Sequence, residues 1–499
     1  MKVYYKILIK IVLLGFVLIL FNYIYSVFFF EDDIQKHSET INQVREVVNQ
    51  NCEVVYLGES SNTTFRDHDL DKRAISNFVE EYYPNIKFGH ITKNASHAAV
   101  YYTLLKNIPQ QSNVKTVIVT LNLRSFNANW IYSDLETPLQ KGLVMLQDYP
   151  PLINRFLLSF KGYDHKSNIE RKIQTQIKWR TDNFKFPYAF EHKNVIEWDD
   201  AMSKTGIKNI DGTINQKLTT LAGHYIKTYA FQIDTSTNPR IKDFDNIVKL
   251  AADRKWNLVF NLLAENTEKA NTLVGKDLLY LIEYNRRLLI DRYNGKGVIV
   301  VDNLNDVDDI EFIDQDWTTE HYAENGRKII AKNIADSLKS LYPEKYKEVV
   351  YNENSQTYFF NNCDSTVIWS SMHTVTTEKA YSGNRSSKTD GLKNVFSITL
   401  GYPMQRLTDD LDSIDIDFQI YATTATNNLN AAIEFSDKNS VQSWKGIPLE
   451  SRITPGKWCR FSYTHPISAE EKKYDLIKIY VVNSSGTIVY IDDFGVKFH

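Results

Sequence analysis

The chain has 499 residues, of which 43% are hydrophobic and 24% are charged, so it can bury at least one large core and is neither disordered nor fibrous. Its length suggests two or three domains. The formal net charge is only -3 and no basic stripe is interleaved with aromatic residues, which argues against a nucleic acid as a partner.

The first predicted element is a membrane anchor. Residues 11–30 read IVLLGFVLILFNYIYSVFFF, and a helix of this length spans the ~30 Å hydrocarbon layer of a bilayer. Three lysines precede this run and three acidic residues follow it, so the N-terminus should stay in the cytoplasm and the bulk should be extracytoplasmic. No A-x-A-like site follows, so we expect residues 1–33 to form an uncleaved single-pass anchor.

The next part of the chain, residues 34–348, alternates short β-branched runs with amphipathic helical segments. This alternation predicts an α/β domain with a flavodoxin-like, doubly wound parallel sheet. A closing helix is expected over residues 324–341, with Ile330, Ile334 and Leu338 facing the sheet. The predicted strands are residues 53–57, 86–92, 114–123, 256–263 and 296–304.

Residues 127–239 interrupt the alternation and are too long for an ordinary connection, so they predict a helical insertion. Ile169, Ile173 and Ile177 recur at helical spacing within residues 167–180 and predict a helix there. The surroundings are mildly basic. A solvated helix face explains this better than contact with an anionic substrate or lipid headgroups.

Residues 349–499 contain regularly spaced, alternating short strands without intervening helices, which predicts a β-sandwich. Two of the three cysteines, Cys363 and Cys459, lie in this region. An exported chain can form a disulfide between them, and two buried thiols are an equally good interpretation.

The segment LGESSN follows the first predicted strand, at the edge of a parallel sheet where functional groups collect. Ser60 within it would lie at a helix start, where N–H groups favour an oxyanion. The same residue types are also ordinary in a turn and N-cap, so this segment alone does not identify a nucleophile.

Two further residues are predicted at the same edge. His321 lies between the last strand and the closing helix, and a histidine is the usual base that activates a serine. Asn122 ends the third strand, and an asparagine amide can donate to the oxyanion of an acyl-transfer reaction. A surface histidine and a turn asparagine are the structural alternatives.

These elements resemble the SGNH/GDSL hydrolase superfamily. Its first block, Gly-Asp-Ser, is similar to residues 58–60, its third, Gly-x-Asn-Asp, to residues 120–123, and its last, Asp-x-x-His, to residues 318–321. The resemblance implies that Ser60 is the nucleophile, His321 the base, and Asn122 with the backbone N–H of Ser60 the oxyanion hole. The family's second block supplies a glycine N–H, which we place near Ala95.

The chain departs from the family at the acid that supports the base. The position three residues before His321 is Thr318. Asp316 or Glu320 would then orient the imidazole from a shifted position, or the site would work as a Ser-His dyad. We prefer Asp316, because Glu320 adjoins the histidine and should point away.

An anchor before such a domain resembles a narrower group, the membrane-tethered SGNH proteins that act with membrane-bound O-acyltransferases (MBOAT) on cell-envelope glycans. The C-terminal region resembles carbohydrate-binding jelly-roll modules through YSGNRSSK and VYIDDFGVKF. In such modules, acids near the last strand hold a structural calcium, for which Asp492 and Asp493 are candidates. Trp369 and Trp444 are candidates for stacking on sugar rings, whereas Trp458 is expected in the core.

The sequence therefore predicts a membrane-anchored, extracytoplasmic SGNH-type serine esterase or O-acyltransferase that acts on acyl esters, above all acetyl esters, of cell-envelope or extracellular glycans. This chemistry requires no metal or organic cofactor. The alternative is a catalytically inactive, tethered protein that binds or assembles glycans, and the threonine at position 318 favours it.

Overall fold

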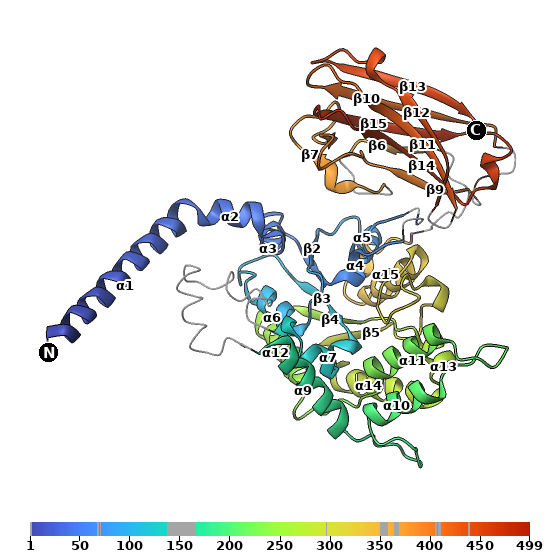
Figure 1. Ribbon diagram of the computed structural model, residues 1–499. Helices are drawn as coiled ribbons and strands as arrows, with labels where there is room; N and C mark the ends of the chain where they lie inside the picture. Colours follow the sequence, from blue (N-terminus) through green and yellow to red (C-terminus); the bar gives the residue numbers. More distant parts are fainter. Residues whose placement is uncertain are drawn as a thin grey trace. The chain divides into compact units, whose positions relative to one another are not determined.

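The computed structural model describes residues 2–499 except 67, 68, 70, 137–165, 296, 350–357, 364–368, 405, 406, 408–410, 438 and 439 (Figure 1). The chain divides into two compact units. Unit 1 comprises Met1–Thr64 and Ile75–Glu348, and unit 2 comprises Phe65–Ala74 and Val349–His499.

The N-terminal helix α1 (Lys2–Phe28) contains a stretch, Val3–Phe28, that is long and apolar enough to cross a membrane. It begins earlier than the predicted span of residues 11–30 and ends before residue 30. Helices α2 (Phe30–His37) and α3 (Glu39–Asn49) follow, and α3 packs its apolar face near β2 (Phe88–Thr92).

All five predicted strands of unit 1 are present. They form a parallel sheet in the order β2-β1-β3-β4-β5, which is the order of flavodoxin-like doubly wound sheets. Four of the strands are shorter than predicted, and β1 keeps its predicted length but is shifted by one residue. Besides β2, the strands are β1 (Val54–Gly58), β3 (Thr116–Leu121), β4 (Asn257–Leu262) and β5 (Val298–Asp302).

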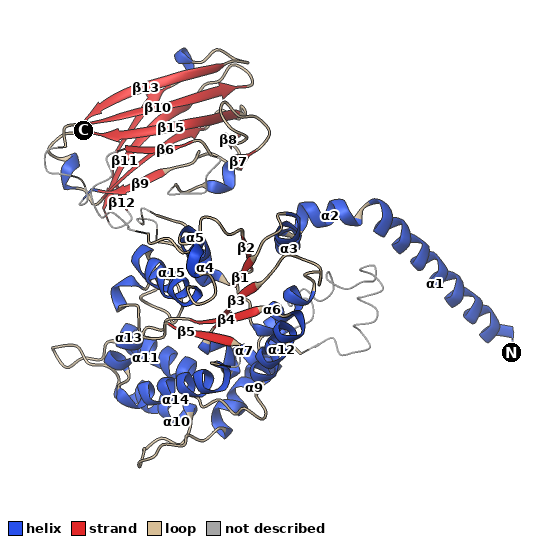
Figure 2. Cartoon of the chain, turned by 180° about the vertical axis from the view of Figure 1, so that it is seen from behind, coloured by secondary structure: helices blue, strands red, loops and turns tan. Residues whose placement is uncertain are grey.

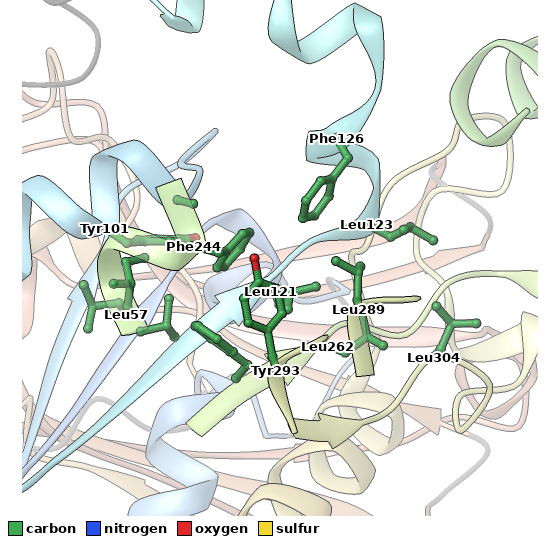
Figure 3. Packing of buried hydrophobic residues seen from close by; sticks show 14 of the residues in the cluster. Leu57, Tyr101, Leu121, Leu123, Phe126, Phe244, Leu262, Leu289, Tyr293 and Leu304 are labelled. Atoms are coloured by element: carbon green, nitrogen blue, oxygen red, sulfur yellow. The ribbon is translucent and has the colours of Figure 1, made fainter. Parts of the chain in front are cut away.

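Successive residues of each strand point to opposite sides of the sheet, and both sides are covered by helices. Leu57 and Leu121 join the large core against α6 (Ala98–Lys106), α12 (Pro239–Arg254) and α14 (Lys276–Tyr293) (Figure 3). Tyr56 is equally buried but lies outside this cluster. Helices α5 (Ile75–Glu81) and α15 (Glu324–Leu338) pack against each other on the other face (Figure 2).

The described part of the inserted region is helical, as expected, and the helix predicted at residues 167–180 is present with its isoleucines on an exposed face. In α9 (Asn168–Thr181), Ile169, Ile173 and Ile177 are exposed, whereas Arg171 and Thr175 are buried. The remaining helices of unit 1 are α4 (Ser60–Thr63), α7 (Ala128–Ile131), α10 (Val195–Thr205), α11 (Gln216–Tyr229) and α13 (Thr267–Leu273).

Unit 2 contains two antiparallel sheets with an apolar core. In β10 (Ser413–Ala422), buried and partly exposed residues alternate, because one face of the strand packs on the core. One sheet has the order β13-β10-β15-β8-β7, with β6 also paired to β15, and the other has the order β12-β11-β14-β9. The other strands are β6 (Tyr358–Asn361), β7 (Val375–Thr376), β8 (Ser386–Thr389), β9 (Leu400–Pro403), β11 (Leu429–Asp437), β12 (Ser440–Pro448), β13 (Trp458–Pro466), β14 (Leu476–Asn483) and β15 (Val489–Phe498).

None of the three cysteines forms a disulfide in this structure, so Cys363 and Cys459 are not joined. Cys52 and Cys363 are buried and Cys459 is partly exposed.

Candidate active site

Three side chains at the carboxyl edge of the parallel sheet form a continuous hydrogen-bonded chain. The Nε2 atom of His321 lies 3.0 Å from the Oγ atom of Ser60, and its Nδ1 atom lies 2.7 Å from Oδ2 of Asp314. A carboxylate can only accept, so Nδ1 carries the hydrogen and Nε2 accepts the hydroxyl hydrogen of Ser60. This is the arrangement of a serine nucleophile, a histidine base and an orienting acid.

Ser60 is positioned by the tight turn between β1 and α4. The neighbouring Asn62 is buried, and its amide donates to Thr92 Oγ1 at 2.8 Å and to Ser76 Oγ at 3.1 Å. Gly58 precedes the turn because a Cβ there would meet the Cβ of Asn62 at 2.8 Å. The segment after β1 is thereby tied to β2 and α5, which fixes the start of α4 at Ser60.

His321 and Asp314 lie on one hairpin, residues 311–323, which we call the histidine hairpin. Phe312 and Tyr322 form an antiparallel bridge, and the N–H of Ile313 donates to the carbonyl of His321 at 2.9 Å. Asp314 therefore lies across the hairpin from His321. The hydroxyl of the buried Tyr322 donates to the carbonyl of Ala264 at 2.8 Å, which holds the hairpin at the sheet edge.

The prediction that Asp316 supports the base is wrong in this structure. Asp316 is largely exposed and forms an ion pair with Lys217 at 2.8 Å. Asp314 takes its place, and its Oδ2 also accepts from the hydroxyl of Thr319. The other alternative, Glu320, points away from the imidazole as expected and pairs with Arg124 at 2.6 Å.

Asn122 lies at the end of β3 and is buried, but its amide is directed to Glu59. Its Nδ2 atom is 2.5 Å from Oε1 of Glu59, and its Oδ1 atom has no partner within the described part of the chain. An amide nitrogen carries two hydrogens. The predicted oxyanion role of Asn122 would therefore use the second one.

A buried cluster of charges surrounds this edge of the site. Arg124 lies between carboxylates: it pairs with Glu320 and donates to the carbonyl of Thr318. Glu265 is fully buried behind them and accepts from the hydroxyl of Tyr229 at 2.5 Å. A buried cation among acids stabilises their charges only while each polar group keeps a partner.

The pKa values in this cluster are strongly displaced. Burial, and next the charge of Glu320, raise the pKa of Glu59 from 4.5 to about 8. Burial likewise raises the pKa of Glu265, with a further contribution from Glu320. Burial alone would lower the pKa of Arg124, but the neighbouring acids, Glu320 first, hold it above its ordinary value. Glu59 is thus protonated near neutral pH and able to donate a hydrogen bond.

Ala95 lies in the turn after β2 and has a φ of 54°. This left-handed conformation is one that glycine adopts without steric cost. The structure therefore gives Ala95 a backbone conformation suited to the glycine that the family resemblance implies at this point.

Sequence reasoning missed Asp314, Asn62 and the buried cluster around Arg124. Asp314 is one of the acids in the segment FIDQDWTTEH. It was missed because the family motif places the acid three residues before the histidine, and Asp314 lies seven residues before it. The buried cluster could have been anticipated from Glu59 and Glu320, because each of these acids is adjacent to a predicted site residue.

In unit 2, the prediction that Trp369 stacks on a sugar is wrong. Trp369 is only 2% exposed, and its ring packs on Phe494 in the core, with a centroid distance of 4.9 Å. Trp458 is partly exposed, and its ring contacts Tyr381 and Tyr421 instead of entering the core as expected.

Trp444, by contrast, is 49% exposed on β12, at the edge of the four-stranded sheet. Its Nε1 donates to the hydroxyl of Tyr480 at 3.2 Å, and that hydroxyl donates to Glu434 at 2.8 Å. The exposed ring of Phe396 meets Tyr480 edge-on at 5.4 Å. A hollow of about 250 Å³ includes Phe396, Glu434, Lys478 and Tyr480 in its lining. We call Phe396, Glu434, Trp444, Lys478 and Tyr480 the aromatic patch.

Asp492 and Asp493 do not fit a calcium site. The carboxylate of the buried Asp492 accepts from the backbone N–H groups of Tyr381 at 2.7 Å, Ser382 at 3.2 Å and Asp493 at 2.8 Å. Asp493 accepts from the hydroxyl of Ser382 at 2.5 Å. Oxygens that accept from N–H groups organise a turn. Among the described residues, no group of three His, Cys, Asp or Glu residues is arranged to hold a metal.

Comparisons with protein-family models and with curated proteins gave no match. Among solved structures, the chain is similar to the CBM22-1 xylan-binding domain of Paenibacillus barcinonensis Xyn10C, with 16% identity over 28% of this chain and 92% of that chain and a TM-score of 0.22. It is also similar to the C-terminal family 22 carbohydrate-binding module of Clostridium thermocellum Xyn10B, with 12% identity over 30% of this chain and 96% of that chain and a TM-score of 0.21.

Proposed function

We propose that the protein is a membrane-anchored SGNH-type serine esterase or O-acyltransferase that acts on acyl esters of extracytoplasmic glycans. The observation that carries this proposal is the hydrogen-bonded chain Ser60–His321–Asp314 at the carboxyl edge of a doubly wound sheet. A partly exposed serine bonded to a histidine that is itself oriented by an acid is equipped for acyl transfer.

The reaction follows from these contacts. Ser60 Oγ attacks the acyl carbonyl while its proton passes to Nε2 of His321, and the charged imidazole is stabilised by Asp314. The tetrahedral intermediate expels the alcohol, which takes the proton from Nε2 and leaves an acyl-serine ester. Water or a sugar hydroxyl then loses a proton to Nε2 and attacks that ester, and Ser60 recovers the proton as the product leaves.

The oxyanion needs hydrogen-bond donors fixed before the reaction. We propose the backbone N–H groups of Ser60 and Ala95 and the second amide hydrogen of Asn122. The loss of one such donor typically lowers the rate by about 10²- to 10³-fold. Neutral Glu59 supports this role, because it leaves no negative charge directly behind the developing oxyanion.

The anchor and the family resemblance give the proposed setting. Helix α1 is compatible with membrane association. With a cytoplasmic N-terminus, the sheet lies on the outer side, where a membrane-bound MBOAT acyltransferase is the proposed partner and an envelope glycan the proposed substrate.

The test of catalysis uses a fluorophosphonate probe and a chromogenic acetyl ester with the detergent-solubilised chain. We expect the probe to label wild type, Ser60→Ala to abolish labelling, and His321→Ala to slow it by at least about 10³-fold. Adding a neutral oligosaccharide tests whether the acyl group passes to a sugar. A folded wild-type chain without labelling and without turnover, with or without sugar, would rule out the enzyme.

A second candidate function is glycan binding without catalysis, which the aromatic patch favours. Trp444 and Phe396 expose large rings beside the polar groups of Glu434 and Lys478, a combination that suits sugar recognition. Binding of an oligosaccharide that is weakened by Trp444→Ala and retained by Ser60→Ala would support it. Equal affinities of wild type and Trp444→Ala would exclude the patch.

A further inference from the structure

A separate pocket of about 440 Å³ lies within unit 1, beside the candidate active site. Its lining comes from the segment after β3, the short helix α7, helices α9 and α11, and the histidine hairpin. The residues that matter here are Arg124, Trp130, Trp179, Trp317 and Thr318. We call it the tryptophan pocket.

The tryptophan pocket shares a wall with the catalytic triad proposed above. Trp317 and Thr318 belong to the same hairpin as Asp314 and His321. Arg124, which also lines the pocket, binds that hairpin. It donates to the carbonyl of Thr318 and pairs with the carboxylate of Glu320. A ligand in this pocket therefore touches the loop that holds the base.

Three indole rings give the pocket large flat apolar surfaces. Trp317 is 50% exposed, and its ring centroid lies 4.0 Å from that of His224. The Arg124 guanidinium lies over the ring of Trp130 at 5.4 Å. The C–H face of a pyranose ring is flat and weakly apolar, so it suits such surfaces, which also bury area at a low entropic cost.

The same pocket has two buried N–H donors without a partner among the residues the structure describes. They are Nε1 of Trp179 and Nε of Arg124. A buried donor that lacks an acceptor destabilises the folded chain, because it has lost its hydrogen bond to water without gaining another. A ligand with acceptor oxygens, such as ring oxygens and hydroxyls, would remove that cost.

The charges of the lining favour a neutral ligand. Arg124 is already paired with Glu320 at 2.6 Å, and Lys227 with Asp199 at 2.6 Å. Burial, and next the charge of Lys227, lower the pKa of His224, so its ring is uncharged near neutral pH. An anionic sugar would find no uncommitted cation among these groups and would meet the field of the buried acids.

We propose that the tryptophan pocket binds one neutral pyranose unit of a glycan, stacked on the indole rings and hydrogen-bonded to Trp179 and Arg124. We add that this unit carries the hydroxyl that gives or takes the acyl group, and this addition rests on the proposed function. The binding of the sugar itself does not rest on the proposed function.

Isothermal titration tests the binding with the full chain in a detergent that has no sugar headgroup. The parent protein carries Ser60→Ala, to prevent turnover, and Trp444→Ala, to silence the aromatic patch. The probes are xylotetraose and tetra-N-acetylchitotetraose, with tetragalacturonate as the anionic counterpart. We expect a neutral probe to bind and tetragalacturonate to bind at least about tenfold more weakly.

Two substitutions locate the ligand. Trp317→Ala should weaken binding about tenfold or more by removing a stacking surface. Trp179→Phe keeps a ring but removes the N–H donor, and should weaken binding about three- to tenfold. The matched control is Ile177→Ala, an exposed position on the same helix, which should bind like the parent.

The proposal is overturned if neither neutral probe binds, if tetragalacturonate binds more tightly, or if both tryptophan variants bind like the parent while circular dichroism shows them folded. The proposed catalysis is judged separately, by fluorophosphonate labelling of Ser60 in the otherwise unchanged chain. Labelling without sugar binding refutes only the pocket, and sugar binding without labelling refutes only the enzyme.

Discussion

At the scale of single residues, the site contains two nearby aspartates with different surroundings. Asp314 is 2.7 Å from the imidazole of His321, whereas Asp316 faces solvent and pairs with Lys217. A carboxylate behind the base fixes its tautomer and stabilises its positive charge during the reaction. The two aspartates form a matched pair, in which Asp314 contacts the imidazole and Asp316 lies on the surface.

Asp314→Asn should therefore lower kcat/KM for the acetyl ester by about 10²- to 10⁴-fold, since its amide would favour the wrong imidazole tautomer. Asp316→Asn should stay within about twofold of wild type, because an exposed ion pair contributes at most about 1 kcal/mol. Similar losses in both variants would remove Asp314 from its proposed role.

Glu59 should make stability depend on pH in a defined direction. Its pKa is 4.5 in an ordinary environment and about 8 when folded, so between these values the folded chain holds a proton that the unfolded chain has released. The free energy of unfolding then falls as pH rises through this window, by up to about 1.4 kcal/mol per pH unit.

Glu59→Gln removes this proton while keeping an oxygen that accepts from Asn122. We expect the variant to gain stability over wild type as the pH rises from about 5 to about 8, measured by urea unfolding at several pH values. A constant difference between the two proteins would show that Glu59 is ionised in the folded state.

The turn at Ala95 offers a test of backbone strain. A residue with a side chain at φ 54° costs about 1 kcal/mol relative to glycine, partly offset by the greater freedom of glycine in the unfolded chain. Ala95→Gly should be neutral or more stable by up to about 1 kcal/mol and should retain labelling of Ser60. Ala95→Val should lose both stability and labelling, because a β-branched side chain is disfavoured in this conformation.

Ser60 and His321 were predictable because each lies where an element begins or ends, and such positions leave a readable pattern of turn residues. Asp314 was not, since its contact with His321 depends on the pairing of the two arms of the histidine hairpin, in which the neighbouring Ile313 pairs with His321. The two partners of Arg124 likewise come from a distant part of the chain, which local pattern does not report.

At the scale of elements, the five strands of the parallel sheet were predictable because a strand buried on both faces is a short continuous apolar run. The orientation of α9 was not. Its isoleucines at helical spacing indicate a buried face, yet the structure buries Arg171, which donates to the carbonyl of Ser133 at 2.8 Å. The spacing of the isoleucines predicts the helix correctly. Which side of the helix is buried is decided by contacts with other elements, which the spacing does not report.

Arg124 joins two elements, the turn after β3 and the histidine hairpin, and its removal should affect both. Arg124→Met leaves Glu320 buried without its cation, which should destabilise the fold by about 3–5 kcal/mol in denaturant unfolding. Adding Glu320→Gln should restore part of that loss, because the uncompensated charge is then gone. The exposed Arg180→Met serves as the control and should change stability by less than about 0.5 kcal/mol.

At the scale of the whole molecule, α1 should provide membrane affinity and little folding energy. Most of its apolar side chains are exposed in the structure, whereas α3 packs against β2, places Val44 and Val47 in the core of the α/β domain, and contacts α2. Exposed apolar surface contributes to stability only when something covers it, and here a bilayer would do so.

A chain that lacks residues 1–29 should therefore stay in the aqueous phase and keep the melting temperature of the detergent-solubilised full chain within about 3 °C, measured by circular dichroism. A fall of more than about 10 °C, or aggregation with loss of secondary structure, would show that α1 belongs to the folded core. The five-stranded parallel sheet and the antiparallel sheets were within reach of the sequence, because continuous apolar runs indicate the first and alternating apolar residues indicate the second. The grouping of Phe65–Ala74 with unit 2 was not predicted, since these residues lie inside the predicted α/β domain of residues 34–348.

The histidine hairpin also bears on how such sites diverge. Asp314 and His321 stand on its two arms, so residues can be gained or lost at the tip while the two arms stay paired and the two side chains stay in contact. Selection then acts on the pairing of the arms and leaves the number of intervening residues free to drift. A motif search that fixes the acid three positions before the histidine will overlook such relatives, whereas one that allows a hairpin of variable length will find them.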